Sequence, residues 1–178
     1  CKHCITCSSG TDSLILPLMA WDVKEGDAVF VSSFTFVASA EAPAILGATP
    51  VFVDSDPETW DMDPKDLERA IENVKKEGKL NLKAVIAVDI FGNPCDYDEI
   101  KRIAHANGMK VLSDAAQAYG SEYKGVRAGN IADMTSTSFY PTKPLACYGD
   151  GGAVFTNSDE ERDLMVSCRV HGMSPEDH

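Results

Sequence analysis

Short apolar runs alternate with longer amphipathic stretches along the chain. This alternation is typical of proteins in which strands and helices follow one another, and no internal repeat or linker interrupts it. The pattern predicts strands over residues 3–7, 28–31, 50–53, 82–88, 110–113, 134–138 and 152–156. It predicts helices from the polar turn at 8–11 to about residue 20, and over residues 35–46, 63–76, 97–107 and 159–170.

Local signals agree with these elements. Asp63 and Pro64 are typical of a helix start, and Gly47 is typical of a helix end. Strands joined by helical crossovers predict an α/β fold with a mostly parallel seven-stranded sheet covered by helices. Ligands of such sheets bind at the carboxyl ends of the strands, so the residues that directly follow each strand are the candidates for function.

The composition is that of an ordinary globular protein. The chain has 178 residues, 44% hydrophobic and 25% charged, which fits one domain and excludes disordered, collagen-like and coiled-coil chains. Lys and Arg number 16 against 28 Asp and Glu, a formal net charge of −12. Such a charge repels nucleic acid and anionic membranes, so we expect neither as a partner.

The ends of the chain and the length of its apolar runs indicate where in the cell the protein is expected. No apolar run is long enough to cross a bilayer, and the N-terminus lacks the blocks of a signal peptide, so we expect a cytoplasmic protein. The chain opens at Cys1 rather than Met and stops at residues 175–178, soon after a strongly helical segment. We therefore expect a piece of a longer protein.

The spacing of Cys1, Cys4 and Cys7 is one that iron-sulfur ligands can have. If residues 3–7 form a strand, however, residues three apart face opposite sides, and the three thiols cannot converge on one metal. Buried, reduced thiols are the expectation for these cysteines and for the three scattered ones, Cys95, Cys147 and Cys168.

Three strand ends carry candidate chemistry: residues 8–12, 113–118 and 138–143. The first places small residues and hydroxyls at a helix N-terminus, where free N–H groups and the helix dipole can bind a phosphate. The same residues are also ordinary helix caps. The second places Asp114 at the end of an apolar strand, where a carboxylate needs a partner. A cationic ring nitrogen would be a suitable partner. The alternative is that Asp114 is a helix N-cap.

The third strand end carries Lys143. A lysine in a closed site can lose its proton and form a Schiff base with a carbonyl, whereas a surface lysine is the alternative. The glycine-rich turn at 149–152 is not a dinucleotide-binding fingerprint, because a strand follows it rather than a helix, and we expect a hairpin-like bend there. Pyridoxal phosphate needs an anion site, a carboxylate for its ring nitrogen and a lysine for its aldehyde, so one cofactor would explain all three strand ends.

Five strings in order along the chain carry a resemblance to a known family: SSGTDSL at 8–14, SFTFVAS at 33–39, DAAQA at 114–118, SFYPTK at 138–143 and YGDGGA at 148–153. With them the chain resembles the DegT/DnrJ/StrS family of sugar aminotransferases. The resemblance implies the aspartate aminotransferase fold (fold type I) and transfer of an amino group, usually from glutamate, to a keto sugar on a nucleotide. It covers residues 1–178 as the pyridoxal-phosphate-binding large domain, without an N-terminal segment or the C-terminal small domain.

The resemblance also implies roles for single residues. Lys143 would form the Schiff base and, once freed by glutamate, move the proton as general base and acid. Asp114 would keep the ring nitrogen protonated, and Gln117 would lie beside the ring. Phe36 would stack on it, with core packing as the alternative. The phosphate would be held by Thr11, by the backbone of Gly10 and Asp12, and by the Ser138 hydroxyl.

Family members are homodimers whose partner completes the site, so a homodimer is expected of the full-length protein. The string around Lys143 resembles the branch that acts on 3-keto UDP-N-acetylglucosaminuronic acid, although Ala146 stands where we expect Gly. The competing classes are a cofactor-free regulatory or assembly relative, an inactive truncated fragment, and a nucleotide-binding oxidoreductase. The nearby cations that could meet a substrate diphosphate, each with a surface role as the alternative, are Lys124, Arg127, Arg169 and His171.

Overall fold

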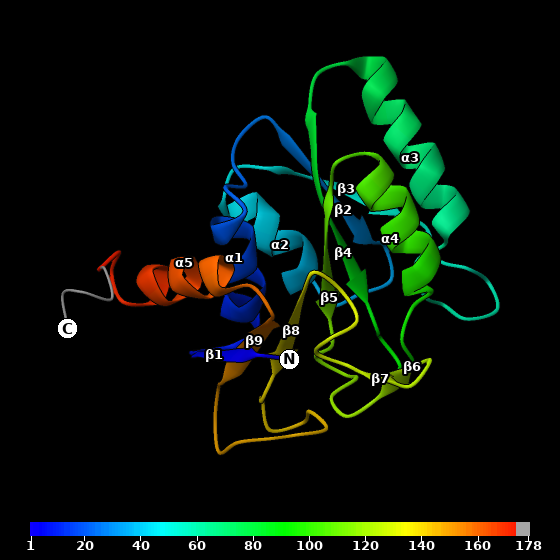
Figure 1. The fold of residues 1–178 in the computed structure, drawn as a ribbon. Helices are drawn as coiled ribbons and strands as arrows, with labels where there is room; N and C mark the ends of the chain where they lie inside the picture. The colour runs from blue at the N-terminus through cyan, green and yellow to red at the C-terminus, as the bar shows by residue number, and fades with distance from the viewer. Residues whose placement is uncertain (174–178) are drawn as a thin grey trace.

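The computed structural model describes residues 1–173, so the last five residues of the expected domain, 174–178, lie outside the described part. A seven-stranded sheet with the order β1-β9-β8-β5-β4-β2-β3 crosses the molecule (Figure 1). Strands β3, β2, β4, β5 and β8 are parallel, whereas β9 runs antiparallel between β8 and β1. The strands are β1 (His3–Cys7), β2 (Asp27–Ser32), β3 (Thr49–Val53), β4 (Asn81–Val88), β5 (Lys110–Asp114), β8 (Met134–Ser138) and β9 (Gly152–Thr156).

Helices cover both faces of the sheet, and each face has its own hydrophobic core. The helices are α1 (Gly10–Ala20), α2 (Ala38–Ile45), α3 (Pro64–Glu77), α4 (Tyr97–Ala106) and α5 (Asp159–Arg169). Helices α1, α2 and α5 supply the core of one face, and α3 and α4 supply that of the other (Figure 1). The predicted α/β class, the seven strands and the five helices are therefore confirmed in kind.

Helix α3 shows why the sequence forms these elements. Asp63 caps its start by accepting a hydrogen bond from the N–H of Lys65, and Pro64 occupies the first turn, where no N–H is needed. Gly78 ends the helix with φ 65°, a left-handed conformation that costs glycine little. Its apolar residues recur at helical spacing and are buried against the sheet: Leu67, Ala70, Ile71 and Val74.

Two details differ from the sequence-based prediction. Helix α2 begins at Ala38 rather than at residue 35, and its N-cap, Val37, provides no side-chain hydrogen bond. Residues 33–37 instead cross the carboxyl edge of the sheet in irregular backbone. A small hairpin of β6 (Glu122–Tyr123) and β7 (Val126–Arg127) was not predicted, because two-residue strands leave no periodicity to detect.

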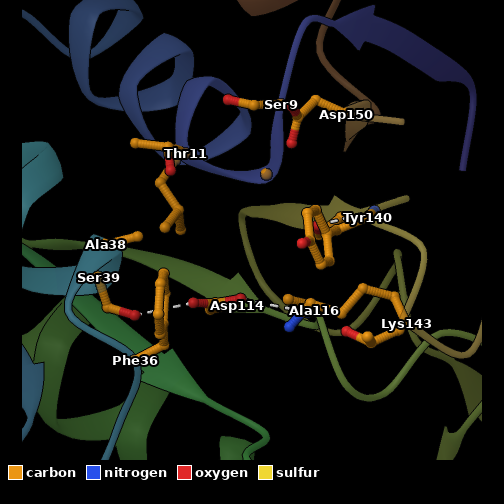
Figure 2. Close-up of a pocket in the computed structure, with 14 residues that line it drawn as sticks. Ser9, Thr11, Phe36, Ala38, Ser39, Asp114, Ala116, Tyr140, Lys143 and Asp150 are labelled. Atoms are coloured by element: carbon orange, nitrogen blue, oxygen red, sulfur yellow. Dashed lines mark hydrogen bonds between the residues drawn. The ribbon is translucent and has the colours of Figure 1, made fainter. Parts of the chain in front are cut away.

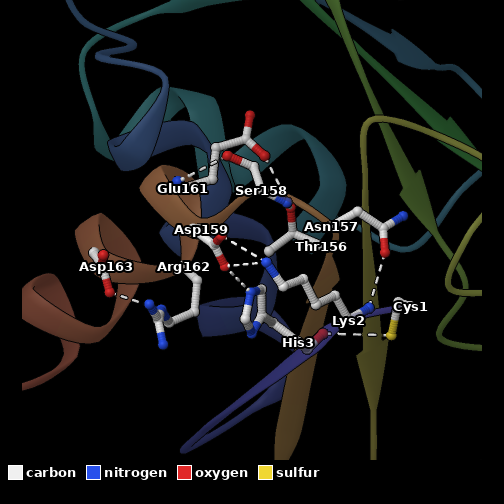
Figure 3. A network of polar contacts seen from close by, with 10 residues as sticks. All are labelled: Cys1, Lys2, His3, Thr156, Asn157, Ser158, Asp159, Glu161, Arg162 and Asp163. Atoms are coloured by element: carbon white, nitrogen blue, oxygen red, sulfur yellow. Dashed lines mark hydrogen bonds and ion pairs between the residues drawn. The ribbon is translucent and has the colours of Figure 1, made fainter.

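The antiparallel edge of the sheet is tied to the start of α5 by polar contacts (Figure 3). The backbone N–H of Lys2 donates to Asn157 Oδ1 at 2.8 Å, and the Lys2 ammonium pairs with Asp159 at 2.6 Å. His3 Nε2 lies 2.6 Å from the same carboxylate. Strand β1, which has a neighbour on one side only, is thereby fixed at its N-terminal end.

The six cysteines are free thiols. Burial was predicted for all of them, but only Cys95 is buried. Strand β1 lies at the edge of the sheet, so its thiols alternate between solvent and a half-covered face rather than entering the core. Burial raises the pKa of the Cys7 thiol to about 11, which favours the protonated thiol over the nucleophilic thiolate. Within residues 1–173, no helix is both long enough and apolar enough to cross a membrane.

Candidate active site

A cavity of about 530 Å³ opens at the carboxyl end of the sheet, between the starts of α1 and α2 and the segment that joins β8 to β9 (Figure 2). Its volume is in the range of small-molecule sites, roughly 300–1,000 Å³. The cavity is lined by Ser9, Gly10, Thr11, Leu14, Phe36, Ala38, Ser39, Asp114, Ala116, Ser138, Tyr140, Thr142, Lys143 and Asp150. The three strand ends singled out in the sequence thus meet at one cavity.

The first wall is the N-terminus of α1. Ser9 caps the helix by accepting a hydrogen bond from the N–H of Asp12 at 3.0 Å. A Cβ on Gly10 would lie 2.6 Å from Ser138 Cβ, so only glycine allows this approach of the helix to β8. Gly10 and Thr11 therefore place the positive end of the helix beside the Ser138 hydroxyl, an arrangement suited to an anion.

Asp12 lies in the first turn of α1 and takes part in the helix cap. Its carboxylate accepts hydrogen bonds from the hydroxyls of Ser8 and Ser9, its N–H is taken by Ser9, and the residue does not line the cavity. The resemblance implies that the backbone of Asp12 helps to hold the phosphate, and this role stays a prediction.

Asp114 forms part of the second wall and is 6% exposed. Its Oδ2 accepts a hydrogen bond from the Ser39 hydroxyl at 2.9 Å, and its Oδ1 accepts one from the N–H of Ala116 at 3.2 Å. Burial raises the pKa of the Asp114 carboxyl, while these two hydrogen bonds and the charge of Lys143 lower it. A turn rather than a helix follows Asp114, so the alternative of a helix N-cap is wrong.

Lys143 forms part of the third wall, on the segment that follows β8. Its N–H donates to the carbonyl of Tyr140 at 2.8 Å, which holds a tight turn, and its side chain is half-buried at the cavity. In Figure 2 Lys143 and Tyr140 lie on the side of the cavity away from Phe36 and Ser39. An amine and a buried carboxylate thus share one site, and the charge of Lys143 favours the ionised form of Asp114.

Phe36 precedes α2 and is 68% exposed at the cavity, so the alternative that it packs in the core is wrong. Its ring lies beside Asp114 in Figure 2. Gln117 is exposed in the turn after β5 and does not line the cavity. Its carbonyl instead faces Gly92, where an added Cβ would come within 3.0 Å.

Several lining residues were not singled out from the sequence. Tyr140 and Thr142 lie inside the string 138–143, so their closeness to Lys143 was a usable signal. Asp150 likewise lies in the glycine-rich turn. Ser39 lies at the end of the string 33–39, but its contact with Asp114 joins residues 75 positions apart and could not be predicted from that string.

The cations considered for a substrate diphosphate lie elsewhere on the described surface. Lys124 pairs with Asp98, Arg127 with Glu122, and Arg169 Nη1 donates to the carbonyl of Thr6 at 2.9 Å. These three residues and the exposed His171 do not line the cavity. The structure therefore supports the alternative given for each of them, a surface role rather than a contact with a substrate diphosphate.

The sequence profile described as the DegT/DnrJ/EryC1/StrS aminotransferase family matches residues 1–178. A UDP-2-acetamido-2-deoxy-3-oxo-D-glucuronate aminotransferase of Pseudomonas aeruginosa is 46% identical over 99% of this chain, which covers 47% of that protein. A pleiotropic regulatory protein of Geobacillus stearothermophilus is 41% identical over 98% of this chain, which covers 45% of that protein. The chain therefore spans about half the length of the curated relatives it matches.

Solved structures give the same result. A DegT/DnrJ/EryC1/StrS aminotransferase from Brucella abortus superposes with a TM-score of 0.92 at 49% identity, over 93% of this chain and 44% of that one. S. venezuelae DesV, solved in complex with a ketimine intermediate, superposes with a TM-score of 0.90 at 36% identity, over 97% of this chain and 44% of that one. The predicted aspartate aminotransferase fold is confirmed.

Proposed function

The chain belongs to the DegT/DnrJ/EryC1/StrS aminotransferase family, and we propose that it is the cofactor-binding part of an enzyme that uses pyridoxal phosphate to transfer an amino group to a keto sugar on a nucleotide. The observation that carries the proposal is the meeting of Lys143, Asp114 and the N-terminus of α1 at one cavity. These are the lysine, the acid and the anion site that the cofactor requires.

The residues present fit pyridoxal phosphate, which when bound acts as an electron sink for the amino acid and sugar carbons. Gly10, Thr11 and Ser138 would hold its phosphate, because Gly10 leaves no Cβ between the helix end and the Ser138 hydroxyl. Asp114 would accept a hydrogen bond from the ring nitrogen, since its buried carboxylate favours a cationic partner.

The remaining walls suit the ring and the proton transfers. Phe36 is exposed at the cavity and would stack on the ring. The Lys143 amine would bind the cofactor aldehyde and later carry the proton between the two reacting carbons. The roles proposed for Gln117 beside the ring and for Asp12 near the phosphate rest on the family resemblance, since neither residue lines the cavity.

Relatives of this chain are named for aminotransferases of nucleotide-linked sugars. Besides the P. aeruginosa protein, a GDP-perosamine synthase of Escherichia coli O157:H7 is 38% identical, and a dTDP-3-amino-3,4,6-trideoxy-alpha-D-glucose transaminase of Streptomyces venezuelae is 36% identical. We propose a nucleotide-linked keto sugar as acceptor, with a 3-keto UDP-N-acetylglucosaminuronic acid as the first to test, and glutamate as donor. A purely regulatory role, suggested by the G. stearothermophilus name, would leave the Lys143–Asp114 arrangement without a purpose.

We further propose that a second copy of the full-length protein completes the site, as a homodimer. The cavity is open, and an exposed aromatic cluster lies at the same edge of the sheet, after β2, β3 and β4. The ring centroid of Phe34 lies 5.5 Å from that of Trp60 and 5.8 Å from that of Phe91. Exposed apolar clusters of this kind are typical of protein interfaces.

The test is to add pyridoxal phosphate to the purified protein, record its visible absorbance and then add glutamate. A band that is lost in Lys143→Ala, kept in Lys124→Ala and bleached by glutamate is the expected result. Lys124 is the matched control because it is an exposed lysine, paired with Asp98, outside the cavity. A folded protein that gives no band, or an equal band in Lys143→Ala, would contradict the proposal.

A further inference from the structure

Ser39 is a buried cavity residue whose contacts converge on Asp114. It lies in the first turn of α2, is 1% exposed, and its hydroxyl is 2.9 Å from Asp114 Oδ2. Its oxygen is also 2.8 Å from Thr35 Oγ1, one helical turn earlier in the chain. The two hydroxyls and the carboxylate form a short chain of hydrogen bonds at the floor of the cavity (Figure 2 shows the Ser39–Asp114 link).

The direction of this chain follows from proton counting. An ionised carboxylate only accepts hydrogen bonds, and a serine hydroxyl has a single proton to donate. With Asp114 ionised, Ser39 gives its proton to Asp114 Oδ2, and Thr35 must then donate to Ser39. If Asp114 were protonated on Oδ2, its proton would go to Ser39 and both donations would reverse.

We propose that Ser39 is a positioning residue that holds Asp114 oriented and ionised toward the cofactor ring, and that Thr35 fixes the direction in which Ser39 donates. The proposal rests on the proposed function, since it concerns the residue assigned to the ring nitrogen. It assigns a purpose to the irregular backbone at 33–37, which places Thr35 over the first turn of α2.

The other groups that face Asp114 are few. Lys143 and Asp150 line the same cavity, Asp89 follows the neighbouring strand and donates its N–H to the Asp114 carbonyl at 3.1 Å, and the N–H of Ala116 reaches Oδ1. The lining residues from α1 and α2 carry no charge. Ser39 is therefore the side-chain donor among the described residues that contacts the carboxylate directly.

The first experiment uses the protein without cofactor. The carboxyl carbon of Asp114 is followed by NMR through a pH titration and assigned with Asp114→Asn. A hydrogen bond to a charged group is worth enough to move a pKa by about one to two pH units, so Ser39→Ala is expected to raise the Asp114 pKa by that amount. Thr35→Val, which keeps the shape of the side chain, is expected to raise it less, and Ser39→Thr to restore it.

The matched control is Ser32→Ala. Ser32 is also a 1% exposed serine, but its hydroxyl has no hydrogen-bond partner within residues 1–173. Its replacement is expected to leave the Asp114 titration unchanged. Equal Asp114 titrations in wild type, Ser39→Ala and Thr35→Val, all folded by circular dichroism, would overturn the proposal.

The second experiment adds pyridoxal phosphate to the same variants. Ser39→Ala is expected to keep the Lys143-dependent absorbance band but to shift the pH midpoint of its titration. The affinity for the cofactor is expected to fall about tenfold. A band whose pH profile matches wild type would contradict the proposal. Absence of the band in wild type would contradict the proposed function instead, and the cofactor-free titration would still decide whether Ser39 sets the ionisation of Asp114.

Discussion

Asp114 and Asp89 end neighbouring strands of the sheet, yet their surroundings give them opposite uses. Val88 is the register partner of Asp114, so Asp89, one residue further, points to the other face of the sheet. Asp114 faces the cavity with Ser39, whereas Asp89 is fully buried with Tyr97 and Cys95 in the core under α3 and α4.

The difference lies in what can still reach each carboxylate. Asp89 accepts hydrogen bonds from the N–H of Cys95 at 3.0 Å, from the Tyr97 hydroxyl at 2.9 Å and from the Ser113 hydroxyl at 3.3 Å. Burial nevertheless raises its pKa to about 7. Asp114 accepts two hydrogen bonds and remains open on the side that faces Lys143. Asp89, which is fully buried and hydrogen-bonded within the core, has a structural role, whereas Asp114 can still bind a cation in the cavity.

We expect the largest effect on activity when the charge of Asp114 is removed. Asp114→Asn keeps the shape and removes the charge that would hold a ring proton. The rate of glutamate-dependent bleaching of the cofactor band is expected to fall about 10²- to 10³-fold, as when a charge-stabilising group is removed from an active site. Stopped-flow absorbance measures this rate.

The folding of Asp114→Asn serves as its control. Because burial raises the pKa of Asp114 in the folded protein, the neutral amide should not lower the free energy of unfolding near neutral pH. A variant that unfolds more easily but reacts at the wild-type rate would reverse the roles assigned to Asp114 and Asp89.

Asp89→Asn should produce the complementary result. The folded pKa of about 7 lies above the ordinary 3.8, so between about pH 4 and pH 7 the folded state holds a proton that the unfolded state releases. Wild-type stability should therefore fall as pH rises through this window, by at most about 1.4 kcal/mol per pH unit. Urea unfolding of Asp89→Asn should show a flatter pH profile, with little change in the bleaching rate. A parallel profile would show that Asp89 is ionised throughout.

Gly152→Ala tests whether the cavity depends on the close packing of the start of α1 against β9. A Cβ there would overlap the carbonyl of Ser9 and come within 3.0 Å of the Thr137 carbonyl, so α1 must shift away from β9. We expect a loss of about 1–3 kcal/mol in the free energy of unfolding and weaker cofactor binding. Gly149→Ala is the control, because an added Cβ there meets nothing within 4 Å. Equal urea midpoints for the two variants would contradict this account.

The sequence carried most of the fold and part of the site. Strands β1, β8 and β9 match their predicted ranges, because short runs rich in β-branched residues and bounded by turn residues are typical of strands. Lys143, Asp114 and Gly10 were found because each lies at the end of a strand or in the segment that follows one, at the carboxyl edge of the sheet. In these cases the chemistry and the local pattern coincide.

The contacts that the sequence did not predict join distant residues. The placement of Ser39 on Asp114 depends on how α2 packs over the sheet, and α2 starts later than its composition suggested. The Asp89–Tyr97 hydrogen bond depends on the turn between β4 and α4. Neither contact has a periodic signature, because hydrogen bonds between elements are set by tertiary packing rather than by propensity.

A third carboxylate, Asp159, is exposed, and we expect its substitution to have the smallest effect of those considered. It is exposed at the opposite edge of the sheet, and its hydrogen bond from Lys2 and then that from His3 lower its pKa below the ordinary 3.8 (Figure 3). Its contribution to stability is thus present above pH 3.8 and lost as pH falls through the folded pKa. Asp159→Asn should lower the thermal midpoint slightly at neutral pH and low salt, and high salt should remove the difference. Glu160→Gln, which removes a charge from the same turn without an ion pair among the described residues, is the control. An equal midpoint shift in Asp159→Asn and Glu160→Gln, or a shift that high salt leaves unchanged, would contradict the stabilising role of the Asp159 ion pair.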